Sequence, residues 1–450
     1  MRNIITILTA LLLLPTMLFS QSLFESATAV DENSTNKLKL DFNGYGRGSA
    51  FVGFDEYNFT TIFGETALIG KLNYNNAFLF SDIRLREGYA FNEPNSTIQF
   101  KEVYAGFSSK KFDVLLGNQI VTWGRTDGFN PTNCITPNDY FFLTSNTDDQ
   151  KLANFMLRFK YRITDQIELD LISIPIYNSS IYRYELFELG ENVSFSDMVL
   201  PDKTFENAAL AARLNFELPK AGFSVSYFRG YNPDYGFDTQ SIDWTSGMPV
   251  VTNVATPYIK NMIGVDFSIP VKSWIIRGEM AYNITEDYKD KMYVPNPDLS
   301  YVAGLERNFS GFNTILQYIG KYTFDFTELS VPVLTDPANP FAQVQYANDL
   351  IYYESKMFNR RQFYQQEEFN HALALTVSKP IAYDIWNIEL TAYYNFTSEE
   401  YMFRPKVSWD ISDALSASAG YSYMAGSEKQ IFDYAGPVLN GGFIELKVNF

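Results

Sequence analysis

Apolar and polar residues alternate with a period of two along nearly the whole chain, which predicts strands with one apolar and one polar face. In the segment 152–162, Phe155, Leu157 and Phe159 share one face, while Arg158 and Lys160 share the other. About eighteen segments of this kind can be recognised. Their approximate spans are 37–52, 62–73, 77–88, 98–108, 111–122, 152–162, 166–175, 206–217, 221–230, 258–269, 273–283, 299–308, 312–325, 368–379, 384–396, 400–411, 414–425 and 441–450.

The connections between these segments alternate in length. Short turns at 75–76, 109–110, 164–165, 219–220, 270–271, 310–311, 381–382 and 412–413 always join an even strand to the next odd strand. The long connections, at 123–151, 176–205, 231–257, 284–298, 326–367 and 426–440, fall at the opposite strand ends. This order predicts an all-β fold, a transmembrane antiparallel up-and-down β-barrel. We expect about eighteen strands, with about sixteen as the alternative. The short turns should be periplasmic and the long loops extracellular.

Both ends of the chain agree with this prediction. Residues 1–20 combine Arg2 with an apolar run, as in a secretory signal peptide. Residues 21–36 are polar and too few for a folded plug, so we expect a flexible periplasmic segment followed by a barrel over 37–450. The last strand, 441–450, has two distinct faces and ends in Phe450, which by resemblance to bacterial barrels is the signal read by the barrel-insertion machinery.

Composition narrows the class further. After residue 20 no run of about 18 apolar residues occurs, which argues against helical membrane spans. The 39 Phe and 31 Tyr residues are typical of a barrel with aromatic girdles at both membrane interfaces. A formal net charge of −17 argues against nucleic acid, and the single cysteine, Cys134, excludes an internal disulfide. The expected partners are therefore outer-membrane lipid, lipopolysaccharide and the insertion machinery.

Charged residues should face the lumen, because a charge on the lipid face near the midplane costs about 2–4 kcal/mol. The sequence thus predicts a polar, water-filled interior lined by both signs of charge. These side chains either form a constriction that orients solutes in a transverse field, or pair across strands and brace a wide wall. The candidate pore-lining residues are Arg84, Arg86, Arg125, Asp127, Arg158, Lys160, Arg162, Arg213, Arg277, Glu279, Glu389, Arg404 and Lys406.

The connection after the fifth strand carries the most distinctive motif. It reads Gly117-x-Gln119-x-Val121-x-Trp123-Gly124, followed by Asn130-Pro131. The motif resembles a Gram-negative family of outer-membrane porin-like barrels of unknown function and, more loosely, the polysaccharide-export barrels. The first resemblance implies an envelope transporter as a possible partner, and traffic of hydrophobic molecules or lipids.

The course of this connection is open on sequence alone. Gly124 and Gly128 are turn formers that would let the chain leave the wall, with Arg125 and Asp127 folded inward as a ledge. The alternative is a rigid extracellular turn with Trp123 and Phe129 as packing residues. In the longest connection, 341–358 has a near-helical period and predicts a short helix, either capping the pore or simply part of a folded loop.

No constellation of residues predicts an enzyme, a metal site or a cofactor. The only histidine, His371, falls on the lipid-facing side of its strand, but Leu373 occupies the position where a lipase-like site would need a serine. Asp148 and Asp149 match no calcium loop, so we expect them in a solvated extracellular segment.

The sequence therefore favours a channel for passive passage of polar or amphipathic solutes, or the outer-membrane part of an export route. A structural or partner-binding surface barrel with a loop-plugged lumen is the alternative. Barrel width permits transport but does not require it.

Overall fold

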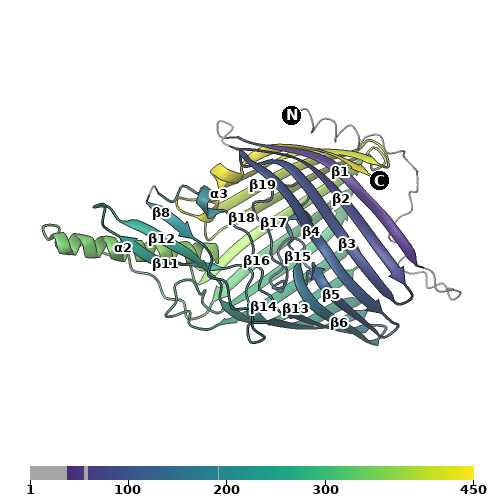
Figure 1. Ribbon diagram of the computed structural model, residues 1–450, viewed down its shortest axis with the longest axis horizontal. Helices are drawn as coiled ribbons and strands as arrows, with labels where there is room; N and C mark the ends of the chain where they lie inside the picture. Colours follow the sequence, from purple (N-terminus) through teal and green to yellow (C-terminus); the bar gives the residue numbers. More distant parts are fainter. Residues whose placement is uncertain (1–37, 55–58, 191) are drawn as a thin grey trace.

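The computed structural model describes residues 38–54, 59–190 and 192–450, so the predicted signal peptide and the segment 21–36 lie outside the described residues. Eighteen strands form one sheet in which neighbours along the chain pair antiparallel (Figure 1). They are β1 Lys39–Gly53, β2 Thr60–Tyr74, β3 Ala77–Ala90, β4 Glu93–Ser108, β5 Phe112–Gln119, β6 Asn154–Thr164, β7 Ile167–Ile174, β9 Ala209–Leu218, β10 Ala221–Tyr231, β13 Ile259–Val271, β14 Trp274–Thr285, β15 Asp298–Phe309, β16 Phe312–Thr323, β17 Phe369–Ile381, β18 Trp386–Asn395, β19 Glu400–Asp410, β20 Leu415–Ala425 and β21 Gly441–Asn449.

The sheet closes on itself through β1 and β21, which pair from Tyr45↔Asn449 to Gly53↔Gly441. Gly44 and Phe450 extend this seam, because each donates its N–H to the other's carbonyl at 2.9 Å. A Cβ on Gly44 would lie 2.9 Å from the Phe450 ring, so the glycine makes room for the terminal aromatic side chain. Closure over eighteen strands confirms the predicted fold class and rejects the smaller count.

Short turns gather at one end of the barrel and most long connections at the other; we call these the turn end and the loop end. At the turn end the β13–β14 turn falls at 272–273, two residues later than predicted, because Pro270 and Val271 still pair with β14. At the loop end β3 and β4 are joined by Phe91 and Asn92 alone, both with positive φ. This hairpin was not predicted, because no Gly accompanies Asn92 to mark the turn.

The two faces of the wall differ as the alternation predicts. Outward-facing Leu85, Phe155 and Ile263 are exposed, whereas inward-facing Arg47 and Glu65 are buried. One part of the inner face departs from the expected polar lining. On β6, β7, β9, β10, β13 and β14 it carries the buried apolar residues Met156, Ile172, Ile174, Ala209, Ala211, Phe228, Met262 and Ala281.

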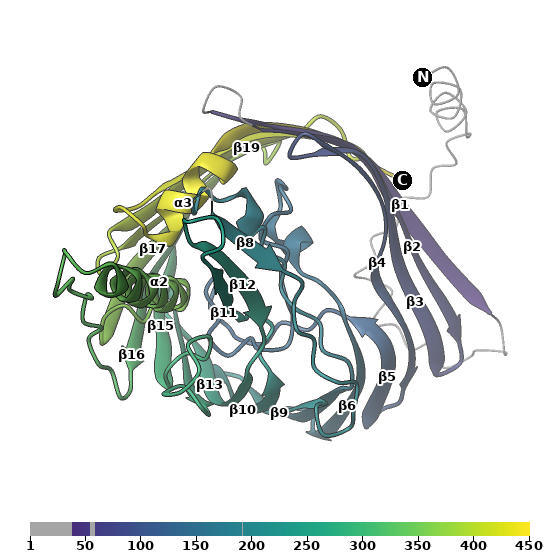
Figure 2. The same cartoon turned by 60° about the vertical axis from the view of Figure 1, so that its left-hand side comes forward.

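Further elements lie at the loop end (Figures 1 and 2). A small three-stranded sheet contains β8 Val193–Ser196, β11 Gly236–Asp243 and β12 Val250–Thr256. Helix α2, Pro340–Gln362, confirms the predicted helix and packs on β11, while α3, Ile431–Leu439, packs on β20. Among the described residues, no helix has both the length and the apolarity needed to span a bilayer.

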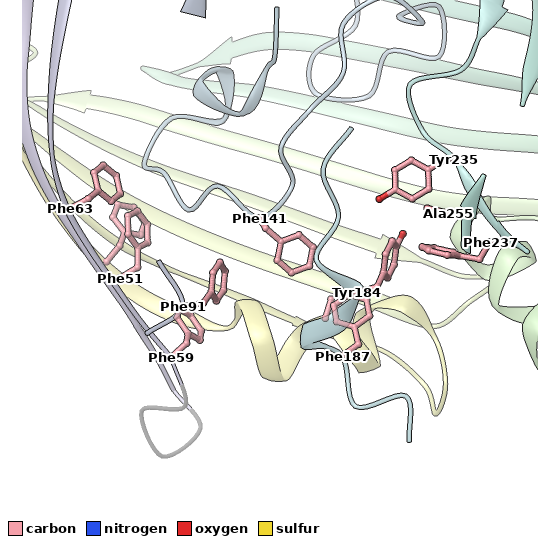
Figure 3. Packing of buried hydrophobic residues seen from close by; sticks show 12 residues of the cluster. Phe51, Phe59, Phe63, Phe91, Phe141, Tyr184, Phe187, Tyr235, Phe237 and Ala255 are labelled. Atoms are coloured by element: carbon pink, nitrogen blue, oxygen red, sulfur yellow. The ribbon is translucent and has the colours of Figure 1, made fainter. Parts of the chain in front are cut away.

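Aromatic side chains join these elements to the wall. We call the buried set the mouth cluster; it comprises Phe51, Phe59, Phe63, Phe91, Phe141, Tyr184, Phe187, Tyr235, Phe237, Ala255, Ala435 and Phe443. Figure 3 shows Phe141 between the phenylalanines of the β1–β3 wall and the rings around Tyr184. Its ring centroid is 6.0 Å from Phe91 and 5.9 Å from Phe187. The loops at this end are thus a packed unit with a core of their own.

Candidate functional site

Residues 120–153, which connect β5 to β6, leave the wall and enter the barrel; we call them the crossing loop. The Ile120 N–H donates to Glu102 Oε1 of β4 at 2.9 Å, where the chain turns away from its strand. Gly124 follows with a φ of 104°, and a Cβ there would lie 2.5 Å from the Glu279 carboxylate. A glycine is therefore required where the loop meets the opposite part of the wall.

The first limb of the crossing loop, 121–136, is held by apolar packing. Val121, Trp123, Cys134 and Ile135 cover the apolar patch of the inner wall, and the Trp123 side chain is only 1% exposed. A buried tryptophan contributes far more contact area than a surface turn would use. Both sequence readings of this segment hold in part, since the loop turns inward and Trp123 is a packing residue.

Glu279 of β14 fixes this limb from the wall. Its carboxylate accepts the Thr132 N–H at 2.9 Å, the Thr132 hydroxyl at 2.7 Å, the Thr126 hydroxyl at 2.8 Å and the Arg125 N–H at 3.1 Å. Since buried carboxylates are costly unless satisfied, these four donors make Glu279 an anchor for the loop.

Arg125 and Asp127 lie on the wall beside this anchor. Arg125 Nε lies 2.8 Å from Asp266, and its Nη2 lies 2.7 Å from Glu217. Arg277 donates to the Arg125 carbonyl at 2.9 Å and lies 3.7 Å from the Asp127 carboxylate. The two predicted ledge residues therefore sit in one charged group with β9, β13 and β14.

The loop then reaches the far side of the ring. Phe129 stacks on Tyr393 of β18, with ring centroids 5.3 Å apart and planes at 19°. Because β18 stands almost opposite β5 in the strand order, this contact carries the chain across the lumen.

The second limb, 144–151, is held by charges on β1, β3, β4, β19 and β21. Asp149 bridges Arg47 at 2.7 Å and Arg84 at 2.8 Å. Lys101 Nζ donates to the carbonyls of Asp149 and Lys151 at 2.7 and 2.5 Å. The prediction that Asp149 is solvated was wrong, because the loop folds inward, whereas the Asp148 side chain is exposed.

Further contacts complete this limb. Ser145 donates to Glu445 at 2.7 Å, and Arg404 donates to the Thr144 carbonyl at 2.5 Å. Burial alone would raise the pKa of Asp149, but Arg47 and Arg84 hold that pKa at about 2, below its ordinary 3.8. Asp149 is therefore ionised at neutral pH and ties the loop to the wall.

The cations around Asp149 also have partners on the wall itself. Arg47 pairs with Glu65 at 2.7 Å, Arg86 pairs with the same carboxylate at 2.5 Å, and Arg84 pairs with Asp82 at 2.9 Å. Removing Asp149 would thus leave Arg47 with Glu65 and Glu445, and Arg84 with Asp82.

The other candidate residues pair on the inner wall, all between neighbouring strands except Arg213 of β9, which reaches Asp266 of β13 across β10. Arg158 contacts Asp170 at 2.7 Å, Lys160 contacts Glu168 at 2.8 Å, Arg162 contacts Asp113, Arg213 contacts Asp266 at 3.0 Å, and Lys406 contacts Glu389 at 3.1 Å. Cross-strand pairs of this kind brace a sheet. Their role in lining a pore stays a prediction.

Several central residues were absent from the sequence candidates. Arg47 and Glu65 lie on strands whose alternation was recognised, so their inward direction was available from the pattern. Lys101 was not available in this way, because it points inward only through a register shift opposite Asp82 and Ile83 that leaves it as the extra residue of a β-bulge. Their importance was hidden because it depends on Asp149, 48 or more positions away along the chain. His371 lies on the outer face, with Nδ1 2.5 Å from the Tyr318 hydroxyl and its ring stacked on Phe369.

The sequence matches no protein-family model and no curated protein. Its fold is similar to those of solved barrels. Pseudomonas aeruginosa OccK5 (OpdH) aligns over 91% of this chain and 97% of its own, with a TM-score of 0.52 and 8% identity. A BenF-like porin from Pseudomonas fluorescens aligns over 92% and 98%, with a TM-score of 0.52 and 7% identity. Acinetobacter baumannii OccAB2 aligns over 91% and 98%, at 0.51 and 8%. At such identities the likeness establishes a shared barrel fold.

Proposed function

We propose that this protein is a porin-like channel of the bacterial outer membrane for passive passage of polar or amphipathic solutes. The observation that carries the proposal is a closed eighteen-strand wall whose interior is crossed by one loop fixed to opposite sides. A barrel of this size is wide enough for a lumen that loops narrow but need not fill. The crossing loop is then the part of the protein that determines how narrow the passage through the lumen is.

The orientation and location are part of the proposal. The exposed apolar outer face suits a lipid environment, and the predicted signal peptide suits export from the cytoplasm. We place the turn end in the periplasm and the loop end outside, as in bacterial barrels. The shared fold with a BenF-like porin supports this placement. Phe450, seated on Gly44 at the seam, would serve insertion as well as closure.

Selection would come from charges that the loop brings into the lumen. The first limb places Arg125 beside Asp266 and Glu217, and the second places Asp149 between Arg47 and Arg84. Opposite charges on facing walls produce the transverse field that orients polar solutes in narrow pores. The remaining candidate residues, paired within the wall, would contribute less.

An export role is a narrower version of the same proposal. The motif that resembles the porin-like family of unknown function begins the crossing loop, and its Trp123 and Gly124 are what fold that loop inward. The resemblance implies an envelope transporter as partner, and it implies transport of lipids or other hydrophobic molecules. Polysaccharide export is the looser possibility on the same motif.

The mouth cluster favours a second candidate function, a surface barrel that binds a partner while its loops plug the lumen. Its rings pack the loops at the loop end into a unit with α2 and α3. Such a unit offers an ordered outer surface.

Single-channel conductance of the refolded chain 21–450 in a planar bilayer tests the proposal. We expect a steady open conductance with ion selectivity. The double variant Arg125→Ala/Asp127→Ala should change conductance or selectivity, whereas Lys289→Ala, on an exposed loop, should not. A correctly folded barrel that stays silent would reject the channel and support the plugged alternative.

A further inference from the structure

Charged side chains are almost absent from the outer face of the barrel. Within the eighteen described wall strands, the charged residues that point outward are Glu87, Arg229, Arg307 and Lys379. Glu87 and Arg229 lie near the loop end, whereas Arg307 and Lys379 lie near the turn end. Both turn-end residues are cations, although the whole chain carries a net charge of −17. The outer face at the turn end is therefore positive at one place only.

Arg307 and Lys379 are neighbours across a single strand; we call them the girdle pair. Their strands, β15 and β17, both pair with β16, and Figure 2 shows the three strands in the same part of the wall. Arg307 pairs with Thr314 of β16, and Lys379 stands two residues after Val377, which pairs with the same threonine. Thr314 also points outward. The two cations and this hydroxyl thus form one polar group in an otherwise apolar face.

Aromatic rings hold both cations in place. The Arg307 guanidinium lies 4.8 Å from the centroid of the Trp274 ring and 4.7 Å from that of the Phe309 ring. Lys379 Nζ lies 4.0 Å from the centroid of the Phe312 ring. Phe309 and Phe312 pair directly, and both rings are exposed on the outer face. Exposed rings at strand ends mark the interfacial girdle of a barrel, so the girdle pair stands at the height of lipid headgroups.

The protein does not neutralise the girdle pair. Among the described residues Arg307 and Lys379 make no ion pair, whereas inward-facing arginines such as Arg158 and Arg277 have carboxylate partners. The Arg307 Nε is buried and has no hydrogen-bond partner within the same described ranges. For cations on the lipid face at the interface, the anion at hand is the phosphate of a lipid headgroup.

We propose that the girdle pair binds the headgroup of an anionic glycerophospholipid in the periplasmic leaflet. Arg307 offers a planar fork of donors to the phosphate, and Lys379 supplies a second positive charge. Two positive charges favour a headgroup with a net negative charge over a zwitterionic headgroup. The acyl chains follow Leu305 and Leu316, which pair next to the site on the side of the membrane interior and are exposed. This inference rests on the proposed membrane orientation and is independent of conduction through the lumen.

Native mass spectrometry of the refolded chain 21–450 in a neutral detergent tests the lipid site. Phosphatidylglycerol and phosphatidylcholine with identical acyl chains are titrated, and the apparent Kd of the first bound lipid is measured for each. We expect phosphatidylglycerol to bind several-fold more tightly. Arg307→Gln/Lys379→Gln should weaken its binding about 20-fold, since each basic residue at an anionic surface contributes about fivefold. Phosphatidylcholine binding should change little.

Two matched variants separate the site from net charge. Arg229→Gln/Lys289→Gln removes the same number of charges, one outward near the loop end and one on an exposed loop, and should leave phosphatidylglycerol binding unchanged. Arg307→Lys/Lys379→Arg keeps both charges and should retain most of the binding. An equal loss in the Arg229 and Lys289 variant would assign the effect to net charge and overturn the site. A loss in the charge-keeping variant as large as in the Gln variant would overturn recognition by charge.

Inorganic phosphate distinguishes a lipid site from a site for the free anion. In large excess it should not displace phosphatidylglycerol, because it lacks the chains that contact Leu305 and Leu316. Complete displacement would overturn the lipid assignment in favour of free phosphate. Equal affinity for the two lipids would overturn headgroup selection, and unchanged binding in the Gln variant would overturn the site itself.

Heat-modifiable gel mobility verifies that each variant is folded, and Lys379→Gln alone carries the same test, with a loss of about fivefold, if the double variant does not refold. Single-channel conductance is recorded from the same preparations. A conducting barrel without lipid selectivity rejects the girdle pair as a lipid site and leaves the channel proposal standing. A silent barrel that still selects phosphatidylglycerol rejects the channel and supports the lipid site, so the two failures are separable.

Discussion

The two limbs of the crossing loop are attached to the wall by different balances of interaction. The first limb adds a buried apolar patch to its polar contacts, whereas the second depends on ion pairs and hydrogen bonds. The limb around Trp123 and Ile135 is buried in an apolar patch and receives the Glu279 anchor. The limb around Asp149 rests on guanidinium groups and on hydrogen bonds from Lys101 and Arg404. Apolar burial does not titrate with pH, whereas ion pairs respond to pH and are screened by salt. The first limb is therefore the fixed end of the loop, and the second is its adjustable end.

Among the variants that test this contrast, truncation of Trp123 should have the largest effect on stability. Trp123→Ala leaves a cavity in the apolar limb and should lower the free energy of unfolding by about 3–5 kcal/mol. Urea titration in detergent or lipid, followed by tyrosine fluorescence and gel mobility, measures that loss. Trp409→Ala is the control, because Trp409 lies half-exposed on the outer face. An equal loss in both variants would show that the limb is not specially fixed.

Glu279→Gln should weaken the fixed end next. The amide keeps the shape but replaces one acceptor oxygen by a donor facing the Thr126 and Thr132 donors, at a cost of about 1–3 kcal/mol. The loop should then fluctuate, and open-channel noise in bilayer recordings should rise. Glu306→Gln provides the control, since Glu306 contacts Arg277 and not the loop. Unchanged noise would remove Glu279 from its anchoring role.

The sequence predicts the strand order of the barrel well, but it predicts the contacts at the fixed end of the crossing loop only in part. The strands of the wall, most of its turns and α2 follow from local periods and turn residues, so they were predicted closely. The three-stranded sheet β8, β11 and β12 and helix α3 lie in segments that were predicted as connections. The inward apolar residues Met156 and Met262 were not, because apolar positions were assigned to lipid and a loop that covers them is a long-range fact. Asp149 was missed for the same reason, since its arginines lie on β1 and β3. Candidate residues paired within one hairpin, such as Arg158, followed from alternation alone.

Asp149→Asn should loosen the adjustable end without unfolding the barrel. Loss of two charge-assisted contacts should cost about 1–2 kcal/mol, because Glu65 and Asp82 still neutralise Arg47 and Arg84. One negative charge leaves the lumen, so reversal potentials in a salt gradient should shift towards anions. Asp148→Asn is the matched control, because its side chain is exposed. The same shift in both variants would indicate a distant effect of net charge.

The low pKa of Asp149 gives the adjustable end a defined pH window. Because its folded pKa of about 2 lies below the ordinary 3.8, the ion pairs stabilise the loop fully above about pH 4. That stabilisation is lost as the pH falls from about 4 towards 2. Channel noise should therefore rise in this window in the wild type, and the rise should be absent in Asp149→Asn. A transition of equal size in the variant would assign it to other carboxylates.

Phe129→Ala should give the smallest effect, because its partly buried ring packs only on the small cluster of Ala372, Ala374 and Tyr393. Aromatic pairs contribute about 0.5–1.5 kcal/mol beyond the area they bury. Since both limbs remain attached, stability should fall slightly and conductance should rise as the lumen widens near β18. Phe205→Ala, at a fully exposed ring, is the control for conductance. If Phe129→Ala instead lowers stability as much as Trp123→Ala, then the crossing contact, and not the apolar limb, is what holds the loop inside the barrel.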